Sequence, residues 1–95
     1  MRRAARRDAN EPEIIQAIKE IALAENIEIS IFQLSQPGIC DLLIGAPNGN
    51  FLIEVKGKKG KITPQQTAFF TSWKGPAYVT RSASDVKIIM EKILF

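Results

Sequence analysis

The chain has 95 residues, 45% of them hydrophobic, which suits one compact domain with a single core and is too little for two. Thirteen basic residues against ten acidic ones give a net charge of +3, and the excess lies at the N-terminus and over 56–61, which favours a polyanionic partner. No apolar run approaches the roughly 20 residues of a membrane helix, and the arginine-rich start lacks the apolar core of a signal peptide, so we expect a cytoplasmic protein.

The N-terminal part contains a basic segment and then a helical pattern. Residues 1–9 carry several arginines and almost nothing to bury, so we interpret them as a mobile basic arm before a single domain over 10–95. Asn10 fits a helix N-cap, and Glu13 follows at the spacing of a capping box. Apolar residues then recur with helical period, which predicts an amphipathic helix to about Asn26.

Three strands are expected next. Residues 27–34 alternate between apolar and polar, as on a half-buried strand, and the turn signal Gln36-Pro37-Gly38 follows. Two further apolar runs cover 39–46 and 51–55. The segment 47–50 between them contains Asn-Gly, the strongest short hairpin signal, so the two runs are expected to pair.

A loop and a second helix follow the hairpin. The loop 57–61 consists of glycine and lysine alone. Thr63, Pro64 and Gln66 then occupy the cap, first and third positions of a helix start, and the helix is expected to run to about Lys74.

The C-terminal part adds a short strand over 77–80 and a last helix capped by Ser82 or Ser84. The predicted order is αβββαβ(α). This order indicates an α/β domain with a central mixed sheet flanked by helices.

Three charged side chains are expected to meet on one face of the hairpin. Glu54 and Lys56 share a face because side chains alternate along a strand. With Asn48 and Gly49 as the loop, Asp41 lies opposite Lys56 and diagonal to Glu54. Two carboxylates this close repel each other unless a cation neutralises them.

The residue types limit which cation could bind. The chain has no histidine and a single cysteine, Cys40, so it cannot form an intrachain disulfide or the usual zinc site of nitrogen and sulfur ligands. A metal would sit on carboxylate oxygens, which points to magnesium, manganese or calcium.

These residues fit the hydrolysis of a phosphodiester. A divalent ion on Asp41 and Glu54 could activate water, and Lys56 could orient that water or stabilise charge on the phosphate. Gln66 could hold the water or contact the phosphate. Glu13 would be a third carboxylate, from the first helix.

Four segments, in this order, share a pattern with a known family: Gly38-Ile39-Cys40-Asp41-Leu42-Leu43-Ile44, Ile53-Glu54-Val55-Lys56, Lys61-Ile62-Thr63-Pro64-Gln65-Gln66 and Val79-Thr80-Arg81-Ser82. They resemble the VRR-NUC family of the PD-(D/E)xK nuclease superfamily, over roughly 11–90. The resemblance implies a restriction-endonuclease-like fold and a magnesium- or manganese-dependent, structure-selective DNA endonuclease. Stand-alone bacterial and viral members resemble Holliday-junction resolvases and act as homodimers.

The resemblance also implies residue roles. Asp41, Glu54 and the Val55 carbonyl would bind metal, and Lys56 and Gln66 would be catalytic. Glu13 matches the acidic position of the first helix, with Glu11 as the rival.

The nucleic-acid contacts are expected from Lys58, Lys59, Lys61 and Arg81, which follow or lie near the acidic cluster. The chain departs from the family at Cys40, where proline is usual, and at Thr80, where the family motif has arginine. Because of these departures, the resemblance does not fix the conformation of the loop at Cys40 or the DNA contact of Arg81.

Other interpretations stay open at this point. Glu54 and Lys56 could be an ordinary exposed pair, and Gln66 could serve only the capping box. The main alternative function is a nucleic-acid-binding module that does not cleave, and a further one is a small α/β protein without a nucleic-acid role.

Overall fold

The computed structural model describes residues 10–94, so the basic arm predicted for 1–9 lies outside the described residues. The elements follow the predicted order. They are α1 (Glu11–Ala24), β1 (Ser30–Gln33), β2 (Leu42–Ala46), β3 (Gly49–Val55), α2 (Pro64–Ser72), β4 (Ala77–Thr80) and α3 (Ala83–Leu94). Among the described residues, no helix combines the length and the apolar character needed to cross a membrane.

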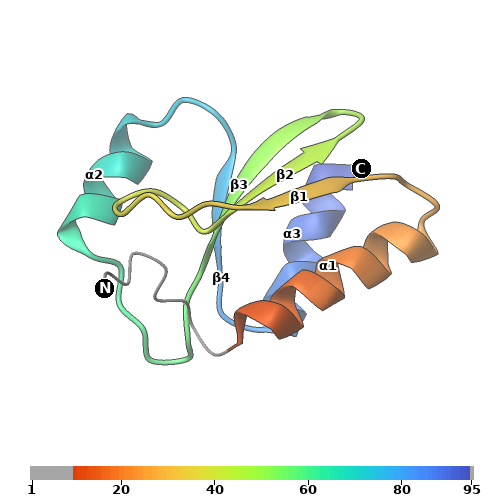
Figure 1. Cartoon of the computed structure of the whole chain (residues 1–95), viewed down its shortest axis with the longest axis horizontal. Helices are drawn as coiled ribbons and strands as arrows, with labels where there is room; N and C mark the ends of the chain where they lie inside the picture. The colour runs from red at the N-terminus through yellow and green to blue at the C-terminus, as the bar shows by residue number, and fades with distance from the viewer. Residues whose placement is uncertain (1–9, 95) are drawn as a thin grey trace.

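The strands form one mixed sheet, as predicted, and their order in it is β1-β2-β3-β4. The first three are antiparallel neighbours, and β4 runs parallel to β3 after the crossover through α2. The carboxyl ends of β3 and β4 therefore meet at one edge of the sheet. Figure 1 shows α1 and α3 side by side against the sheet, with α2 standing apart from them.

The hydrophobic core lies between one face of the sheet and the pair α1 and α3. Ile14 and Ile18 of α1 and Met90 of α3 are fully buried there with Ile53 and Val55 of β3. Because side chains alternate along a strand, burying the residues on either side of position 54 turns that side chain to the opposite face.

The hairpin loop lies one residue earlier than predicted. Ala46 pairs with Gly49, so Pro47 and Asn48 are the two loop residues. Proline explains the difference, because it has no N–H for the strand ladder and its fixed φ suits the first position of a turn.

The corrected register keeps Asp41 on the expected face but changes its neighbour. Leu42 pairs with Ile53, and the Asp41 N–H donates to the Ile53 carbonyl at 3.1 Å. Asp41 itself precedes β2, and its side chain accepts from the Val55 N–H, so its predicted pairing with Lys56 is wrong. The pairing of β2 with β3 moves by two positions, and an even shift preserves which side chains of the strand share a face. Asp41, just before the strand, still lines one pocket with Glu54.

The start of α1 differs from the prediction. Asn10 occupies the N-cap position, but its side chain makes no cap hydrogen bond, so the predicted capping box with Glu13 is wrong. The Asn10 Nδ2 instead donates to the carbonyls of Lys56 and Arg81, each at 3.2 Å. It thus satisfies acceptors at the ends of β3 and β4, where the ladder between the strands stops.

The other two helices begin as their sequences indicate. Thr63 and Gln66 form the predicted capping box of α2, which ends at Ser72 and has no buried side chain. Ser82 caps α3, because its hydroxyl accepts from the Asp85 N–H at 3.2 Å, and this decides between the two serines proposed.

Candidate functional site

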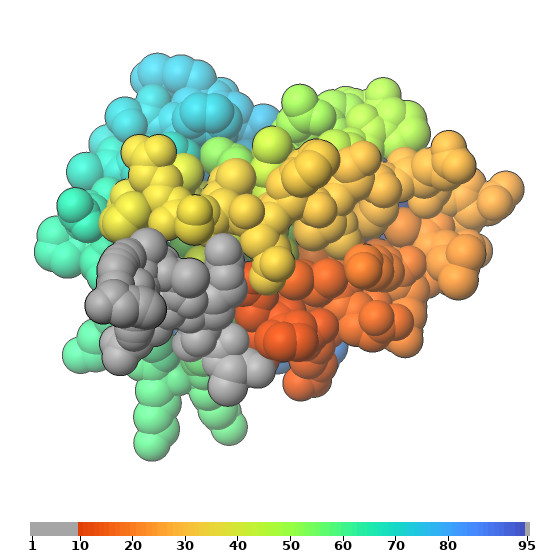
Figure 2. Space-filling model, in the orientation of Figure 1, coloured from red at the N-terminus to blue at the C-terminus, as the bar shows by residue number. Residues whose placement is uncertain are grey.

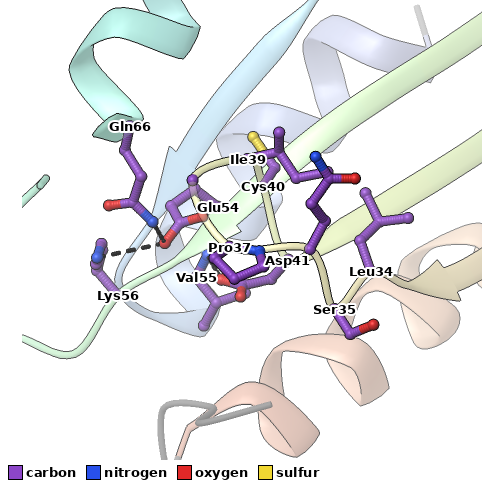
Figure 3. A pocket seen from close by; sticks show the side chains of 12 residues that line it. Leu34, Ser35, Pro37, Ile39, Cys40, Asp41, Glu54, Val55, Lys56 and Gln66 are labelled. Atoms are coloured by element: carbon purple, nitrogen blue, oxygen red, sulfur yellow. Dashed lines mark hydrogen bonds and ion pairs between the residues drawn. The ribbon is translucent and has the colours of Figure 1, made fainter. Parts of the chain in front are cut away.

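A pocket of about 180 Å³ opens where the carboxyl end of β3 meets the segment after β1 and the start of α2. Figure 3 shows Asp41, Glu54, Lys56 and Gln66 around this pocket. The loop side consists of Leu34, Ser35, Gln36, Pro37, Gly38, Ile39 and Cys40. The structure thus brings together four of the residues singled out in the sequence.

Glu54 is the buried centre of the site, with 2% of its surface exposed. Its Oε2 accepts from the Gln66 Nε2 at 2.7 Å and pairs with the Lys56 Nζ at 3.4 Å (Figure 3). Its Oε1 is buried without a hydrogen-bond partner among the described residues. One oxygen is therefore held by two donors, and the other can accept a further ligand.

Backbone hydrogen bonds fix Asp41 beside Glu54. The Asp41 Oδ2 accepts from the Val55 N–H at 2.8 Å, and its backbone carbonyl accepts from the Leu34 N–H at 2.7 Å. β2 begins only at Leu42, so the Asp41 carboxylate accepts the hydrogen bond that a backbone carbonyl of a longer β2 would otherwise accept. The carboxylate is held by the same strand that carries Glu54.

The pocket concentrates negative charge. Burial and, next, the Asp41 charge raise the pKa of Glu54 to about 7 against the opposing effects of Lys56 and Gln66. Burial, then Glu54 and Asp41, raise the pKa of the Cys40 thiol to about 12. An unpartnered buried carboxylate oxygen beside a second carboxylate is an arrangement that a bound cation would stabilise.

Gln66 has both of the roles considered for it. Its Oε1 accepts from the Thr63 N–H at 3.1 Å, which completes the capping box. Because the amide oxygen is committed to that bond, the amide nitrogen must point the other way, toward Glu54. The helix cap therefore orients the donor that reaches the pocket.

The donor set fits a hard divalent cation bound by few protein ligands. No group of three or more histidine, cysteine or acidic residues that could hold a metal occurs in the part of the chain described. The two carboxylates of the pocket and the backbone carbonyl of Val55 would be the ligands. Magnesium binds readily through one or two carboxylates and keeps several waters, so this set suits it.

The structure does not bring Glu13 into the pocket. Glu13 is exposed on α1, whereas Glu11 is 1% exposed and accepts from the Gln33 Nε2 at 2.9 Å. Neither residue lines the pocket. The helical period indicates the burial of Glu11, because position 11 lies on the same stripe of the helix as Ile14 and Ile18.

The basic residues after β3 form a projecting loop. Lys58, Lys59 and Lys61 are exposed, and Figure 2 shows the segment after β3 reaching beyond the body of the molecule. Arg81 is directed inward instead. Its guanidinium donates to the carbonyls of Gly57 and Gly60 in that loop.

Sequence reasoning missed the part that Asn10 plays near the site. Its two carbonyl partners lie 46 and 71 residues away along the chain. No local pattern reports contacts at such separations, so only the folded arrangement could reveal them.

We compared the chain with known proteins. Neither the family models nor the curated protein sequences contain a match. A solved structure described as a "VRR_NUC domain" superimposes with a TM-score of 0.67 and 22% sequence identity, over 88% of this chain and 97% of that one. This likeness confirms the fold expected from the sequence resemblance. The chain therefore has the restriction-endonuclease-like α/β fold of a VRR_NUC domain.

Proposed function

We propose that this chain is a VRR-NUC nuclease that hydrolyses DNA phosphodiesters with magnesium or manganese. The observation that carries the proposal is the pocket in which Asp41 and Glu54 lie together, with Lys56 and Gln66 both on one oxygen of Glu54. The second oxygen of that buried carboxylate has no partner among the residues described.

Asp41, Glu54 and the Val55 carbonyl are the proposed metal ligands. When bound, the ion would supply charge to lower the pKa of water and to neutralise the phosphate. The hydrogen bond from the Val55 N–H keeps Asp41 in place, and the buried position of Glu54 excludes bulk water around it.

Lys56 and Gln66 are the proposed catalytic donors. The Lys56 ammonium is mostly buried beside Glu54, so its charge is weakly screened and can stabilise negative charge that develops on the phosphate. The Gln66 amide, oriented by its helix cap, can hold a water or a phosphate oxygen near the same carboxylate. Glu13 has no part in this proposal.

The proposed substrate is branched DNA, such as a four-way junction, cut by a homodimer. A domain of this size contacts few base pairs, and two copies related by a two-fold axis would span a junction and cut both strands. The exposed lysines of 58–61 follow the strand that carries Glu54 and would contact the phosphate backbone. A monomer at all concentrations in equilibrium sedimentation would remove the dimer from the proposal.

A cleavage assay tests the proposal. Purified protein is incubated with a four-way junction, a flap and a linear duplex, in magnesium, in manganese and in EDTA. We expect metal-dependent nicks, most on the branched substrates, and a loss of about 100-fold or more in rate for Lys56→Ala. Lys19→Ala, on the exposed face of α1, is the matched control.

The same assay separates the alternatives. Cleavage that persists in EDTA, or a Lys56→Ala variant as fast as the original protein, would refute the mechanism. Tight binding without a cut in either metal would instead favour the non-catalytic binding module.

A further inference from the structure

We infer that Arg81 positions the catalytic lysine through the loop after β3 and does not contact DNA. The inference rests on the proposed function, since it assigns Arg81 a role in placing Lys56. It replaces the nucleic-acid contact expected for Arg81 from the sequence. The loop segment 57–60 is called here the glycine turn, after the residues at its two ends.

The glycine turn is closed by one side chain from a distant strand end. The Gly60 N–H donates to the Gly57 carbonyl at 3.0 Å. The Arg81 Nη1 donates to that same carbonyl at 2.8 Å and to the Gly60 carbonyl at 2.5 Å. A single charged donor thus joins both ends of the turn, and charge-assisted hydrogen bonds of this kind are stronger than neutral ones.

Arg81 is itself firmly placed. Its backbone N–H donates to the Asp85 Oδ2 at 2.8 Å, and the Asp85 N–H donates to the capping hydroxyl of Ser82. Its backbone carbonyl accepts from Asn10. The arginine therefore connects the glycine turn to the first turn of α3 and to the start of α1.

The glycine turn packs directly against the side chain of Lys56. A Cβ built on Gly60 would lie 3.2 Å from the Gly57 nitrogen and 3.4 Å from the Lys56 Cδ. The first distance is tighter than ordinary contact and the second lies at its lower edge, so a methyl group would press on the backbone of the turn and meet the aliphatic part of the lysine. Gly60 therefore lies next to the Lys56 side chain. The Lys56 backbone is fixed as well, since its N–H donates to the Thr80 carbonyl at 2.9 Å and its carbonyl accepts from Asn10.

These contacts explain how a flexible side chain keeps a defined position. A lysine has several rotatable bonds and loses much conformational entropy when its ammonium is held in one place. Here the backbone of Lys56 is held by two hydrogen bonds, and the middle of its side chain lies next to Gly60 of the turn that Arg81 closes. The Lys56 Nζ then lies 3.4 Å from the Glu54 Oε2.

Two variants test this role without removing a charge. Arg81→Lys keeps the positive charge but loses the planar guanidinium that joins the two carbonyls. Gly60→Ala changes no charge; its methyl group presses on the Gly57 nitrogen and comes into contact with the Lys56 Cδ. Lys59→Ala, in the same turn but exposed, is the comparison variant for a DNA contact.

We expect Arg81→Lys and Gly60→Ala to slow cleavage of bound DNA in single-turnover assays by about 10- to 100-fold, because small displacements of a catalytic group are costly. Their affinity for DNA and its dependence on salt should not change. Lys59→Ala should instead weaken binding and lower the slope of log affinity against log salt concentration by about 1. Lys19→Ala, away from both groups, should change neither binding nor cleavage. Circular dichroism checks that each variant is folded.

The inference is overturned if Arg81→Lys and Gly60→Ala cleave bound DNA as fast as the original protein, or if Arg81→Lys behaves as Lys59→Ala does. If the original protein does not cleave any DNA, the proposed function fails and the positioning role is still measurable. The NMR signal of the Lys56 ammonium should move in Arg81→Lys and Gly60→Ala and stay in place in Lys59→Ala. An unmoved signal in the first two would also overturn the inference.

Discussion

Glu54 lowers the stability of the metal-free protein because its carboxylate is buried near Asp41. Its pKa is raised to about 7, so the folded chain holds a proton that the unfolded chain has already lost at the same pH. Stability should therefore fall as the pH rises from the ordinary glutamate value through about 7.

Glu54→Gln removes this cost. In EDTA at about pH 8 the variant should be more stable than the original protein by about 1–3 kcal/mol, with almost no gain at about pH 4. Urea unfolding at the two pH values measures the difference, and the variant should not cleave DNA. An equal gain at both pH values would contradict the electrostatic explanation.

Gln66 can be tested through its two separate hydrogen bonds. Gln66→Glu keeps an oxygen for the Thr63 N–H but replaces the donor to Glu54 with a second negative charge. We expect cleavage to fall by about 10- to 100-fold while the helix content stays the same. Gln65→Glu adds the same charge at the preceding, exposed position and is the control; an equal loss there would mean that charge alone matters.

Single residues differed in how well the sequence predicted their place. The shared face of Glu54 and Lys56 follows from strand alternation, a rule that depends only on neighbours along the chain. Asp41 was placed by the hairpin register, and its predicted partner was wrong. The helical period places Glu11 on the buried stripe of α1, whereas the family resemblance favoured Glu13. The contacts of Asn10 and Arg81 join segments far apart in sequence, and no pairwise pattern in the chain reports them.

At the scale of elements, α2 depends on its cap more than the other helices do. It has no buried side chain, whereas α3 buries four, so little tertiary packing stabilises it. Thr63→Ala should cost the first turn about 1 kcal/mol and expose the amides of α2 to faster hydrogen exchange. Ser82→Ala removes the corresponding cap of α3 and should leave that helix protected. Equal protection of α2 before and after Thr63→Ala would contradict this view.

The hairpin shows why element positions are easier to predict than pairing. The apolar runs located β2 and β3, but two adjacent turn signals, Pro47 and Asn48-Gly49, competed for the loop. Pro47 lies in the loop because proline has no N–H to donate to the hydrogen bonds between the two strands. The predicted grouping of Asp41 with Glu54 was unaffected, because an even shift leaves the facing of the strand residues unchanged.

For the molecule as a whole, charge distribution matters more than net charge. We expect the double variant Lys58→Ala, Lys59→Ala to lower the slope of log affinity for DNA against log salt concentration by about 1–2. Each lost phosphate contact means that fewer counterions are released on binding. The double variant Lys87→Ala, Lys92→Ala on the exposed side of α3 has the same net charge and should bind normally. Titrations at several salt concentrations measure both, and matching losses would mean that binding follows net charge.

The architecture was predictable because it follows from local periods, short connections and one parallel crossover. The order of elements along the chain predicted the mixed sheet, whereas the edge at which β3 and β4 end together was found only in the structure. A dimer surface has no such local signature. The sequence predicted a dimer only by resemblance, and sedimentation has to test it.

The hydrogen bond from the Val55 amide to Asp41 has a practical outcome for anyone seeking the natural target. Truncating this side chain to alanine would leave an unsatisfied amide and loosen the hairpin, so a loss of activity would mix damage to the scaffold with damage to chemistry. An asparagine can still accept that bond while it lacks the charge for an ion. Asp41→Asn is therefore the better inactive bait for retrieving uncut nucleic acid from cells by crosslinking.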